Sequence, residues 1–222
     1  MSSDECCATP NNAKRNPPPI FPLVTFRFAL NLPRMTDAAQ NHDLPENIVL
    51  VGFMGSGKST VGRMLARQLR FRFLDTDKLV EERAHMAIPE IFAQHCESYF
   101  RKCETGVLES LRGIRQHILA TGGGIVTVQG NIPLLRSLGL VVLLKADPEE
   151  IYRRVSRNSE RPLLQVEDPR KRVLDLMAAR QPLYESAAHF QVDSTRLRHE
   201  DVTAKIVDEA HRFFNWPKPA RA

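Results

Sequence analysis

The segment IVLVGFMGSGKST, residues 48–60, carries the clearest structural signal in this chain. Its first four residues are apolar and uninterrupted, which is typical of a short buried strand. A glycine-rich turn follows, and the segment matches the pattern G-x-x-x-x-G-K-[ST] at Gly52, Gly57, Lys58 and Ser59. An amphipathic helical pattern begins directly afterwards, so the turn stands between a strand and a helix, which is the context the pattern requires.

A turn of this composition is suited to holding phosphate groups. Glycines let consecutive backbone N–H groups point at phosphate oxygens, and the N-terminus of the following helix adds positive potential. Lys58 can reach the outer phosphates, and the Ser59 hydroxyl can ligate Mg²⁺. We therefore predict that a nucleoside triphosphate binds here with Mg²⁺, and that its phosphates are lined by Gly55, Ser56, Gly57, Lys58, Ser59 and Thr60.

Strand and helix patterns alternate along the rest of the chain. Strands are expected over residues 47–52, 71–75, 117–124, 140–146 and 190–194. Helices are expected over residues 59–70, 77–85, 88–95, 97–113, 147–158, 169–187 and 200–214. Strands separated by helices indicate an α/β fold with a parallel sheet covered on both faces. We predict one such domain over residues 46–216, followed by a short tail at 217–222.

Composition and charge narrow the classes of partner. The chain has 222 residues, of which 42% are hydrophobic, and a formal net charge of +5. Charges cancel before Glu46, so the excess lies in the segment that begins at Glu46, but it forms no basic run and no patch interleaved with aromatic residues. The apolar runs are too short to span a bilayer. We therefore expect small-molecule ligands, no nucleic acid and no membrane.

Residues 1–45 differ from the rest of the chain. The run NPPPIFP is rich in proline, and polar residues are scattered without a period, so we expect an N-terminal extension that is disordered or loosely packed. A transit peptide stays open as an alternative, although the acidic residues Asp4 and Glu5 argue against it. Met35 is an alternative start.

Four cysteines indicate a reducing compartment. They are Cys6, Cys7, Cys96 and Cys103, and no C-x-x-C pair occurs, so a zinc site is not expected. Cys96 and Cys103 are seven residues apart in a helical pattern, and we interpret both as buried, reduced thiols. A cytoplasmic location fits this interpretation.

The metal of a phosphate-binding site needs a carboxylate, and two strand ends offer one. Asp147 ends an apolar run, but in DPEE it also reads as a helix N-cap, with Glu150 closing a capping box. Asp75 and Asp77 end the segment FLDTD and would share a face of an extended chain. Two such carboxylates repel each other unless a cation or a substrate lies between them. We favour Asp147 as the cap, and for Asp75 and Asp77 a metal site and a solvated turn both stay open at this point.

Several motifs together resemble the shikimate kinase family. GFMGSGKSTVGRMLA, FLDTD, FRKCE, TGGGIV, RPLL and MAARQPLY occur in the order and spacing of that family, between Asn47 and about Ser194. The resemblance implies a nucleoside monophosphate kinase-like fold with a five-stranded parallel sheet and a mobile lid. It also implies ATP-dependent phosphorylation of the 3-hydroxyl group of shikimate, in chorismate and aromatic amino acid biosynthesis, and a monomer.

The resemblance also implies roles for particular residues. Asp77 matches the aspartate that hydrogen-bonds the accepting hydroxyl group, and Asp75 matches the one that supports Mg²⁺. Arg101 and Arg180 match the pair that binds the substrate carboxylate, as planar guanidinium groups can do bidentately. The turn that packs against the substrate ring is matched by Gly122, Gly123 and Gly124.

The ATP side and the lid follow from the same resemblance. Arg161 matches the lid arginine that meets the ATP phosphates, within a loop expected at about residues 156–169. Arg154 is expected near the adenine. The expected catalytic residues are Lys58, Asp77 and Arg161. They would promote the phosphoryl transfer by positioning the reacting groups and neutralising their charge.

The chain departs from the family at His85 and Cys96, where members often have glycine, and in its N-terminal extension, which leaves plastid import open. Two alternative functions also remain. One is a kinase of another small polar metabolite such as gluconate, and the other is an ATP-binding regulator without catalysis. A panel of substrates would separate these possibilities.

Overall fold

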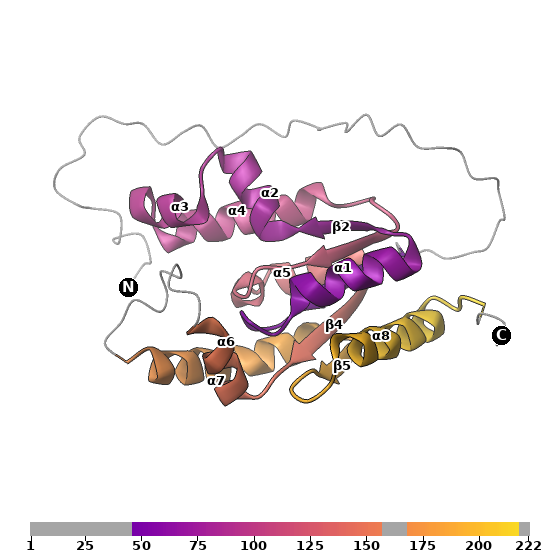
Figure 1. Ribbon diagram of the computed structural model, residues 1–222. Coiled ribbons are helices and arrows are strands. Elements are labelled where there is room, and N and C mark those ends of the chain that lie inside the picture. Colours follow the sequence, from indigo (N-terminus) through magenta and orange to yellow (C-terminus); the bar gives the residue numbers. More distant parts are fainter. Residues whose placement is uncertain (1–45, 157–167, 218–222) are drawn as a thin grey trace.

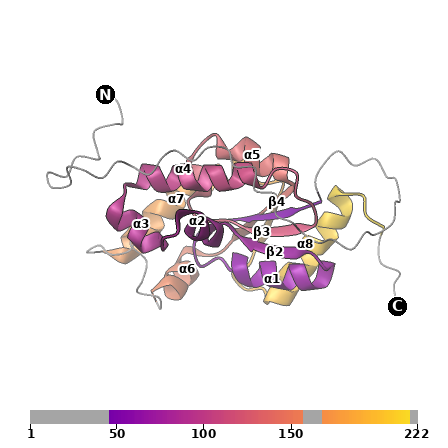
Figure 2. The ribbon, with the colours of Figure 1, turned by 90° about the horizontal axis from the view of Figure 1, so that it is seen from above.

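The computed structural model describes residues 46–156 and 168–217 (Figure 1). The expected N-terminal extension, the chain beyond Pro217 and nearly all of the expected lid, Arg161 included, lie outside the described residues. The described part forms one sheet with helices on both of its faces (Figures 1 and 2).

All five strands run parallel, in the order β2-β3-β1-β4-β5. Their bounds are β1 (Ile48–Val51), β2 (Arg72–Asp75), β3 (His117–Ala120), β4 (Leu140–Lys145) and β5 (Phe190–Asp193). Strand β1 is central, and its Leu50 lies opposite Ala120 of β3 and Val142 of β4. Because the strands are parallel, their carboxyl ends meet at one edge of the sheet. The predicted five-stranded parallel sheet is confirmed.

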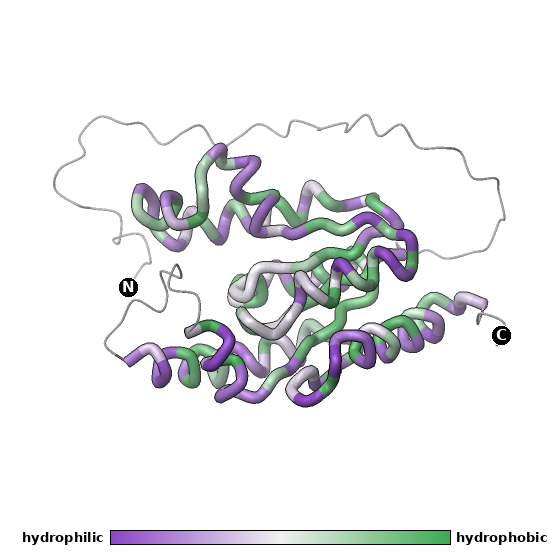
Figure 3. The backbone as a smooth tube through the Cα atoms, viewed as in Figure 1, coloured by the Kyte–Doolittle hydropathy of each residue, from purple (hydrophilic) through white to green (hydrophobic). Residues whose placement is uncertain are grey.

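The helices form a layer on each face of the sheet (Figure 2). Their bounds are α1 (Lys58–Leu69), α2 (Thr76–Ala84), α3 (Ile88–Gln94), α4 (Glu97–Ser110), α5 (Asn131–Leu138), α6 (Pro148–Val155), α7 (Pro169–Ala187) and α8 (His199–Phe213). Along β1, Ile48 and Leu50 pack into the cluster that holds α1 and α8, whereas Val49 and Val51 pack into the cluster that holds α4, α5 and α7. All four side chains have no exposed area, and Figure 3 shows the apolar strands between more polar outer helix faces. A strand buried on both faces explains the uninterrupted apolar run.

One helix and a short 3₁₀ turn were absent from the sequence-based assignment. The turn η2 (Ile125–Thr127) and α5 fill the stretch between the triple glycine and β4. Helix α5 is short and has Pro133 near its start, which hides its period. Leu135 and Leu138 carry the signal that was available, because both are buried at helical spacing.

His85 and Cys96 stand at two positions where glycine is expected from the resemblance, and the backbone conformation explains a preference for glycine at one of them. His85 caps the C-terminus of α2 with φ 50° in the left-handed region, where glycine is the least strained residue. Cys96 precedes α4 in an extended conformation, φ −85°, which any residue adopts. Cys96 therefore lies outside the helix, and both it and Cys103 are only half-buried, so the expectation of two buried thiols on one helix face is wrong.

Candidate active site

The turn between β1 and α1, residues 52–60, is called the phosphate cradle below. Gly52, Gly55 and Gly57 have φ of 141°, 79° and 96°, a region that side-chain-bearing residues rarely adopt. A Cβ atom at Gly52 would also lie 2.5 Å from the Leu144 carbonyl oxygen of β4. Backbone conformation and close packing both require glycine there, as the sequence pattern predicted.

Lys58 lies at the first position of α1 and folds back over the phosphate cradle. Its Nζ donates hydrogen bonds to the carbonyl oxygens of Gly52, at 2.8 Å, and Phe53, at 2.9 Å. The residue is 8% exposed, so the ammonium group is held in a defined position. The N-cap of α1, Gly57, offers no side-chain cap, and the first N–H groups of the helix are suited to an anion.

Asp75 connects the end of β2 to the start of α1. The Ser59 hydroxyl donates to Asp75 Oδ2 at 3.1 Å, and Asp75 Oδ1 accepts from the backbone N–H of Asp77 at 3.2 Å, which caps α2. Asp77 belongs to the first turn of α2, so the expected extended geometry for the two carboxylates is wrong. Because α2 begins directly after its N-cap Asp75, the two side chains diverge: Asp75 reaches the phosphate cradle, and Asp77 reaches the turn after β3.

The triple glycine after β3 lies between these elements. The Gly122 N–H donates to Thr76 Oγ1 at 3.0 Å, and a Cβ atom at Gly122 would lie 2.5 Å from Asp77 Oδ1. A Cβ atom at Gly123 would lie 3.1 Å from the Met54 nitrogen of the phosphate cradle. None of the three glycines has a positive φ, so these positions exclude side chains through close contacts rather than backbone strain.

Two arginines border the same turn from different helices. Arg180 of α7 is 6% exposed, and its Nη1 donates to the Gly123 carbonyl oxygen at 3.2 Å. Tyr184, one turn further along α7, donates to the same oxygen. Arg101 of α4 lies so close to Gly124 that a Cβ atom there would meet its Nη1 at 2.2 Å. The structure thus brings both predicted arginines together, although they are 79 residues apart in the sequence.

Arg101 is oriented by two carboxylates of its own helix. Its Nη1 donates to Glu104 Oε2 at 2.6 Å, and its Nη2 donates to Glu97 Oε1 at 2.6 Å. The Glu97 side chain is 55% exposed, whereas the Glu104 side chain is 1% exposed. Arg101 is therefore held between one solvent-facing and one buried carboxylate, with its guanidinium group against Gly124.

Glu104 is a site residue that the sequence analysis missed. Burial raises the pKa of its carboxyl group to about 7, against the opposing effect of Arg101 and with a further increase from the charge of Asp77. A Cβ atom at Gly122 would lie 2.7 Å from Glu104 Oε1. The available signal was its place three residues after Arg101, which puts both on one side of a helix.

Of the two predicted ATP residues outside the phosphate cradle, Arg154 lies over it. Arg154 of α6 donates from Nη1 to the Gly55 carbonyl oxygen at 3.1 Å and from Nε to Glu150 Oε1 at 2.7 Å. His199, the first residue of α8, also approaches the phosphate cradle, with its Nε2 3.6 Å from a Cβ atom placed at Gly57. His199 was not predicted, because nothing near it in the sequence marks it. Arg161 lies outside the described residues.

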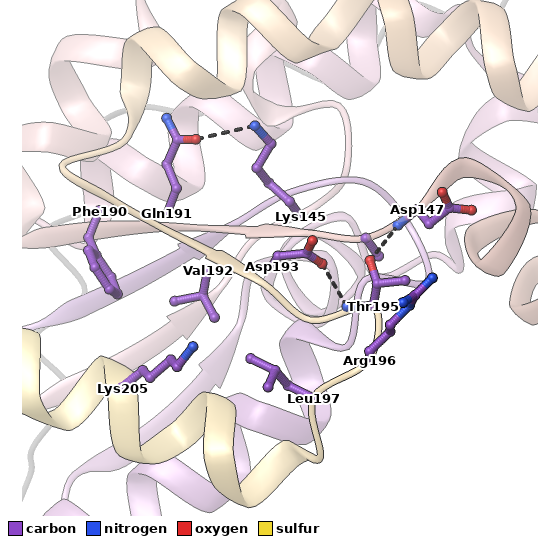
Figure 4. Close-up of a pocket in the computed structure, with 11 residues that line it drawn as sticks. Lys145, Asp147, Phe190, Gln191, Val192, Asp193, Thr195, Arg196, Leu197 and Lys205 are labelled. Carbon is purple, nitrogen blue, oxygen red and sulfur yellow. Dashed lines mark hydrogen bonds between the residues drawn. The ribbon is translucent and has the colours of Figure 1, made fainter.

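Asp147 is the cap of α6, as the sequence favoured. It accepts from the N–H groups of Glu149, at 2.9 Å, and Glu150, at 3.4 Å. The expected capping box is wrong, because the Glu150 side chain pairs with Arg153 and Arg154 instead. Asp147 also borders a pocket of about 860 Å³ along β5, and none of the predicted site residues lines this pocket (Figure 4).

These positions define two adjoining parts of one site. The phosphate cradle presents glycine N–H groups and Lys58. What we call the acceptor side consists of Asp77, Arg101, Gly122–Gly124 and Arg180, and it presents two cations and one carboxylate around a bare backbone turn. This arrangement is able to hold a triphosphate next to a small carboxylic acid that carries hydroxyl groups.

Comparisons with known proteins agree with this geometry. The family model for shikimate kinase matches residues 54–211. A shikimate kinase of Caldanaerobacter subterraneus subsp. tengcongensis is 46% identical over 162 residues, which cover 73% of this chain and 94% of that protein. A shikimate kinase of Bordetella pertussis is 47% identical over 153 residues, which cover 69% of this chain and 72% of that protein.

Solved structures agree as well. The structure of shikimate kinase from Acinetobacter baumannii in complex with shikimate is similar with a TM-score of 0.71 and 42% identity, and the match covers 75% of this chain and 93% of that one. Shikimate kinase from Aquifex aeolicus is similar with a TM-score of 0.64 and 34% identity, and the match covers 72% of this chain and 94% of that one.

Proposed function

The chain belongs to the shikimate kinase family, and we propose that its site transfers the γ-phosphoryl group of ATP to the 3-hydroxyl group of shikimate, giving shikimate 3-phosphate and ADP. The observation that carries the proposal is the contact between the two parts of the site. Gly123 lies against Met54 of the phosphate cradle, while its carbonyl oxygen accepts a hydrogen bond from Arg180. A phosphate held by one part is therefore next to a carboxylate held by the other.

On the ATP side, the phosphates lie along Gly55–Thr60, and Lys58 neutralises negative charge on the group in transfer. Arg154 covers the phosphate cradle next to the nucleotide, which its hydrogen bond to Gly55 supports. Arg161 meets the phosphates from the lid in this proposal. Phosphoryl transfer has a loose transition state, so these cations act mainly by positioning and charge neutralisation.

On the acceptor side, Arg101 and Arg180 bind the shikimate carboxylate, and Gly122–Gly124 let the ring approach the backbone. Asp77 hydrogen-bonds the 3-hydroxyl group and orients it toward the γ-phosphate. A carboxylate is a weak base for an alcohol, so Asp77 first positions the hydroxyl group and accepts its proton late in the transfer. A bidentate arginine contact to a carboxylate fixes both position and orientation of a small acid.

Mg²⁺ is the metal that this donor set fits. Ser59 and Asp75 would hold it, since they provide oxygen ligands beside the phosphate cradle and already contact each other. No group of three or more His, Cys, Asp or Glu residues with metal-binding geometry occurs in residues 46–156 and 168–217. That agrees with a Mg²⁺ site completed by phosphate oxygens and water. When bound, the ion supplies charge neutralisation at the phosphates.

We further infer a monomer, which rests on the resemblance to the family. None of the helices that the structure describes has both the length and the apolar composition needed to cross a bilayer. A cytoplasmic location stays a prediction, with plastid import as its alternative.

The proposal is tested by measuring ADP release from ATP with shikimate, gluconate or no acceptor. We expect ADP release that depends on shikimate, and a phosphorus NMR spectrum that assigns the product phosphate to the 3-oxygen. The Lys58→Met variant serves as the control for contaminating kinases. Preference for gluconate would contradict the acceptor assignment, and ADP release without any acceptor would contradict the transfer itself.

A further inference from the structure

The buried carboxyl group of Glu104 has one oxygen that the site leaves unpaired. Oε2 accepts a hydrogen bond from Arg101 at 2.6 Å, whereas Oε1 has no hydrogen-bond partner among the residues that the structure describes. With the side chain 1% exposed, water does not replace the missing partner freely. A charged, buried oxygen without a donor is unfavourable, and a proton on that oxygen removes the charge.

Several charged and titratable groups face Glu104. Arg101 pairs with Oε2, and Asp77 Oδ1 lies across Gly122 from Oε1. The groups whose charges act on Glu104, or respond to it, are Arg101 and Cys103 of α4, Asp77 of α2, and Arg180 and Tyr184 of α7. Two of them are cations, and both cations favour the ionised form of Glu104 while the site is empty.

Those two cations are the groups to which the substrate carboxylate is assigned. A bound carboxylate would bring negative charge next to Glu104 and would compete with it for Arg101. The substrate would also cover the site and reduce contact with water. Both effects disfavour a charged Glu104, so the bound state should hold its proton more firmly than the free state.

We propose that Glu104 takes up a proton when shikimate binds between Arg101 and Arg180, so that substrate binding and protonation of this buried carboxyl group are linked. The inference rests on the proposed function, because it takes the two arginines as the partners of the substrate carboxylate. Glu104 acts here as a positioning residue, since its charge state sets how strongly Arg101 is drawn away from the substrate.

The direction of the pH dependence follows from this linkage. The free protein holds Glu104 with a pKa of about 7, and the bound state has a higher pKa. Below pH 7 the group is protonated in both states, so affinity does not change with pH. As pH rises through 7, the free protein loses the proton that binding must restore. The shikimate Kd should then rise by up to about tenfold per pH unit until the bound-state pKa is reached.

The experiment is isothermal titration calorimetry of shikimate binding to the full chain between pH 6 and 8.5. Each pH is measured in buffers of different ionisation enthalpy, which gives the number of protons taken up. Wild type should take up about half a proton per shikimate at pH 7 and more at pH 8. Glu104→Gln keeps the shape and the acceptor for Arg101 but cannot take up a proton, so its uptake should be zero and its Kd independent of pH.

The matched control is Glu97→Gln, which removes the charge of the other, exposed partner of Arg101. This variant should keep the proton uptake of wild type, whatever its affinity. Binding of shikimate to wild type without proton uptake would overturn the inference and leave the proposed function standing. A complete lack of shikimate binding would instead contradict the proposed function.

A second measurement covers the case in which Glu104→Gln does not fold. Carbon-13 labelling of glutamate side-chain carboxyl groups in the wild-type protein allows each group to be titrated by NMR. We expect one carboxyl group with a midpoint near pH 7 in the free protein and a higher midpoint with shikimate bound. Midpoints near the ordinary value of about 4.3 for every glutamate in both states would overturn the inference.

Discussion

The phosphate cradle takes all its residues from the contiguous segment 52–60, whereas the acceptor side takes its residues from four separate segments. Strand β1 and helix α1 hold the phosphate cradle directly, and Lys58 contacts the backbone only five and six residues away. Arg180, by contrast, contacts Gly123 across 57 residues of sequence. A contiguous site is set by local backbone geometry, while a dispersed site is set by how helices pack, so substitutions in the two parts should have different kinetic effects.

The largest effect is expected from Lys58→Met in the phosphate cradle. Methionine keeps an unbranched apolar stem of similar length, so the fold should persist, but the charge that meets the transferring group is lost. We expect kcat to fall by about a thousandfold or more. Steady-state kinetics and circular dichroism measure the two quantities. Turnover close to wild type would remove Lys58 from the mechanism. It would also contradict the expectation that substitutions in the phosphate cradle and on the acceptor side have different kinetic effects.

Gly122→Ala should damage the acceptor side without touching the phosphate cradle. The added Cβ atom would meet Asp77 Oδ1 at 2.5 Å and Glu104 Oε1 at 2.7 Å, and both flexible carboxylates would have to move. Displacing an orienting group by about 1 Å lowers kcat/KM by roughly a hundredfold. We expect that loss for shikimate, with the ATP KM nearly unchanged.

The control for this substitution is Gly130→Ala, because no atom lies within 4 Å of a Cβ atom at Gly130. Gly130 precedes α5 with φ −61°, which alanine adopts without strain. Its kinetics should match those of wild type. Equal losses in both variants would show that the effect at Gly122 comes from general destabilisation and not from the acceptor side.

Arg180→Ala should separate binding from chemistry. The arginine contacts the shikimate carboxylate in the ground state and the transition state alike, so its removal should raise the shikimate KM more than it lowers kcat. The loss of one charge-assisted hydrogen bond corresponds to roughly a ten- to hundredfold increase in the shikimate KM. Kinetics with both substrates varied test this, and Arg136→Ala, at an exposed position of α5, serves as the control. A raised ATP KM with an unchanged shikimate KM would reverse the assignment of the two parts.

The smallest effect is expected at a position outside both parts of the site. His85→Gly relieves a left-handed backbone conformation, although glycine also increases the freedom of the unfolded chain. We expect a net gain of about 0.5–1 kcal/mol, or about 1–4 °C in Tm. Cys96→Gly, at an extended backbone position, should give no gain. Thermal unfolding compares the two variants, and an equal gain in both would refute the backbone explanation.

The sequence predicted the fold and the phosphate cradle closely. Apolar-rich segments identified all five strands, although β2 and β5 also contain the polar residues Arg72 and Gln191, and the glycine–lysine pattern located the turn whose φ angles require glycine. The misses have physical reasons. Helix α5 was overlooked because it is short and contains Pro133, and the geometry of Asp75 and Asp77 was mistaken because α2 begins immediately after β2.

On the acceptor side, the residues were predicted by resemblance to a family, and their surroundings were not. Arg101 and Arg180 would each read as a solvated helix residue, yet both are largely buried beside the triple glycine. For Glu104 the only signal was its place three residues after Arg101, because its burial, its unpaired oxygen and its raised pKa arise only when α2, α4, α7 and the turn after β3 pack together.

Local patterning thus determined the order of strands and helices, the phosphate cradle and the cap at Asp147, since each depends on residues within one or two turns of chain. Tertiary structure alone determined which charges meet on the acceptor side. Charge effects depend on distance and on exclusion of water, and both are set by packing between segments far apart in sequence. The pairing of Arg101 with a buried Glu104, opposite Asp77, is therefore a property of the folded chain.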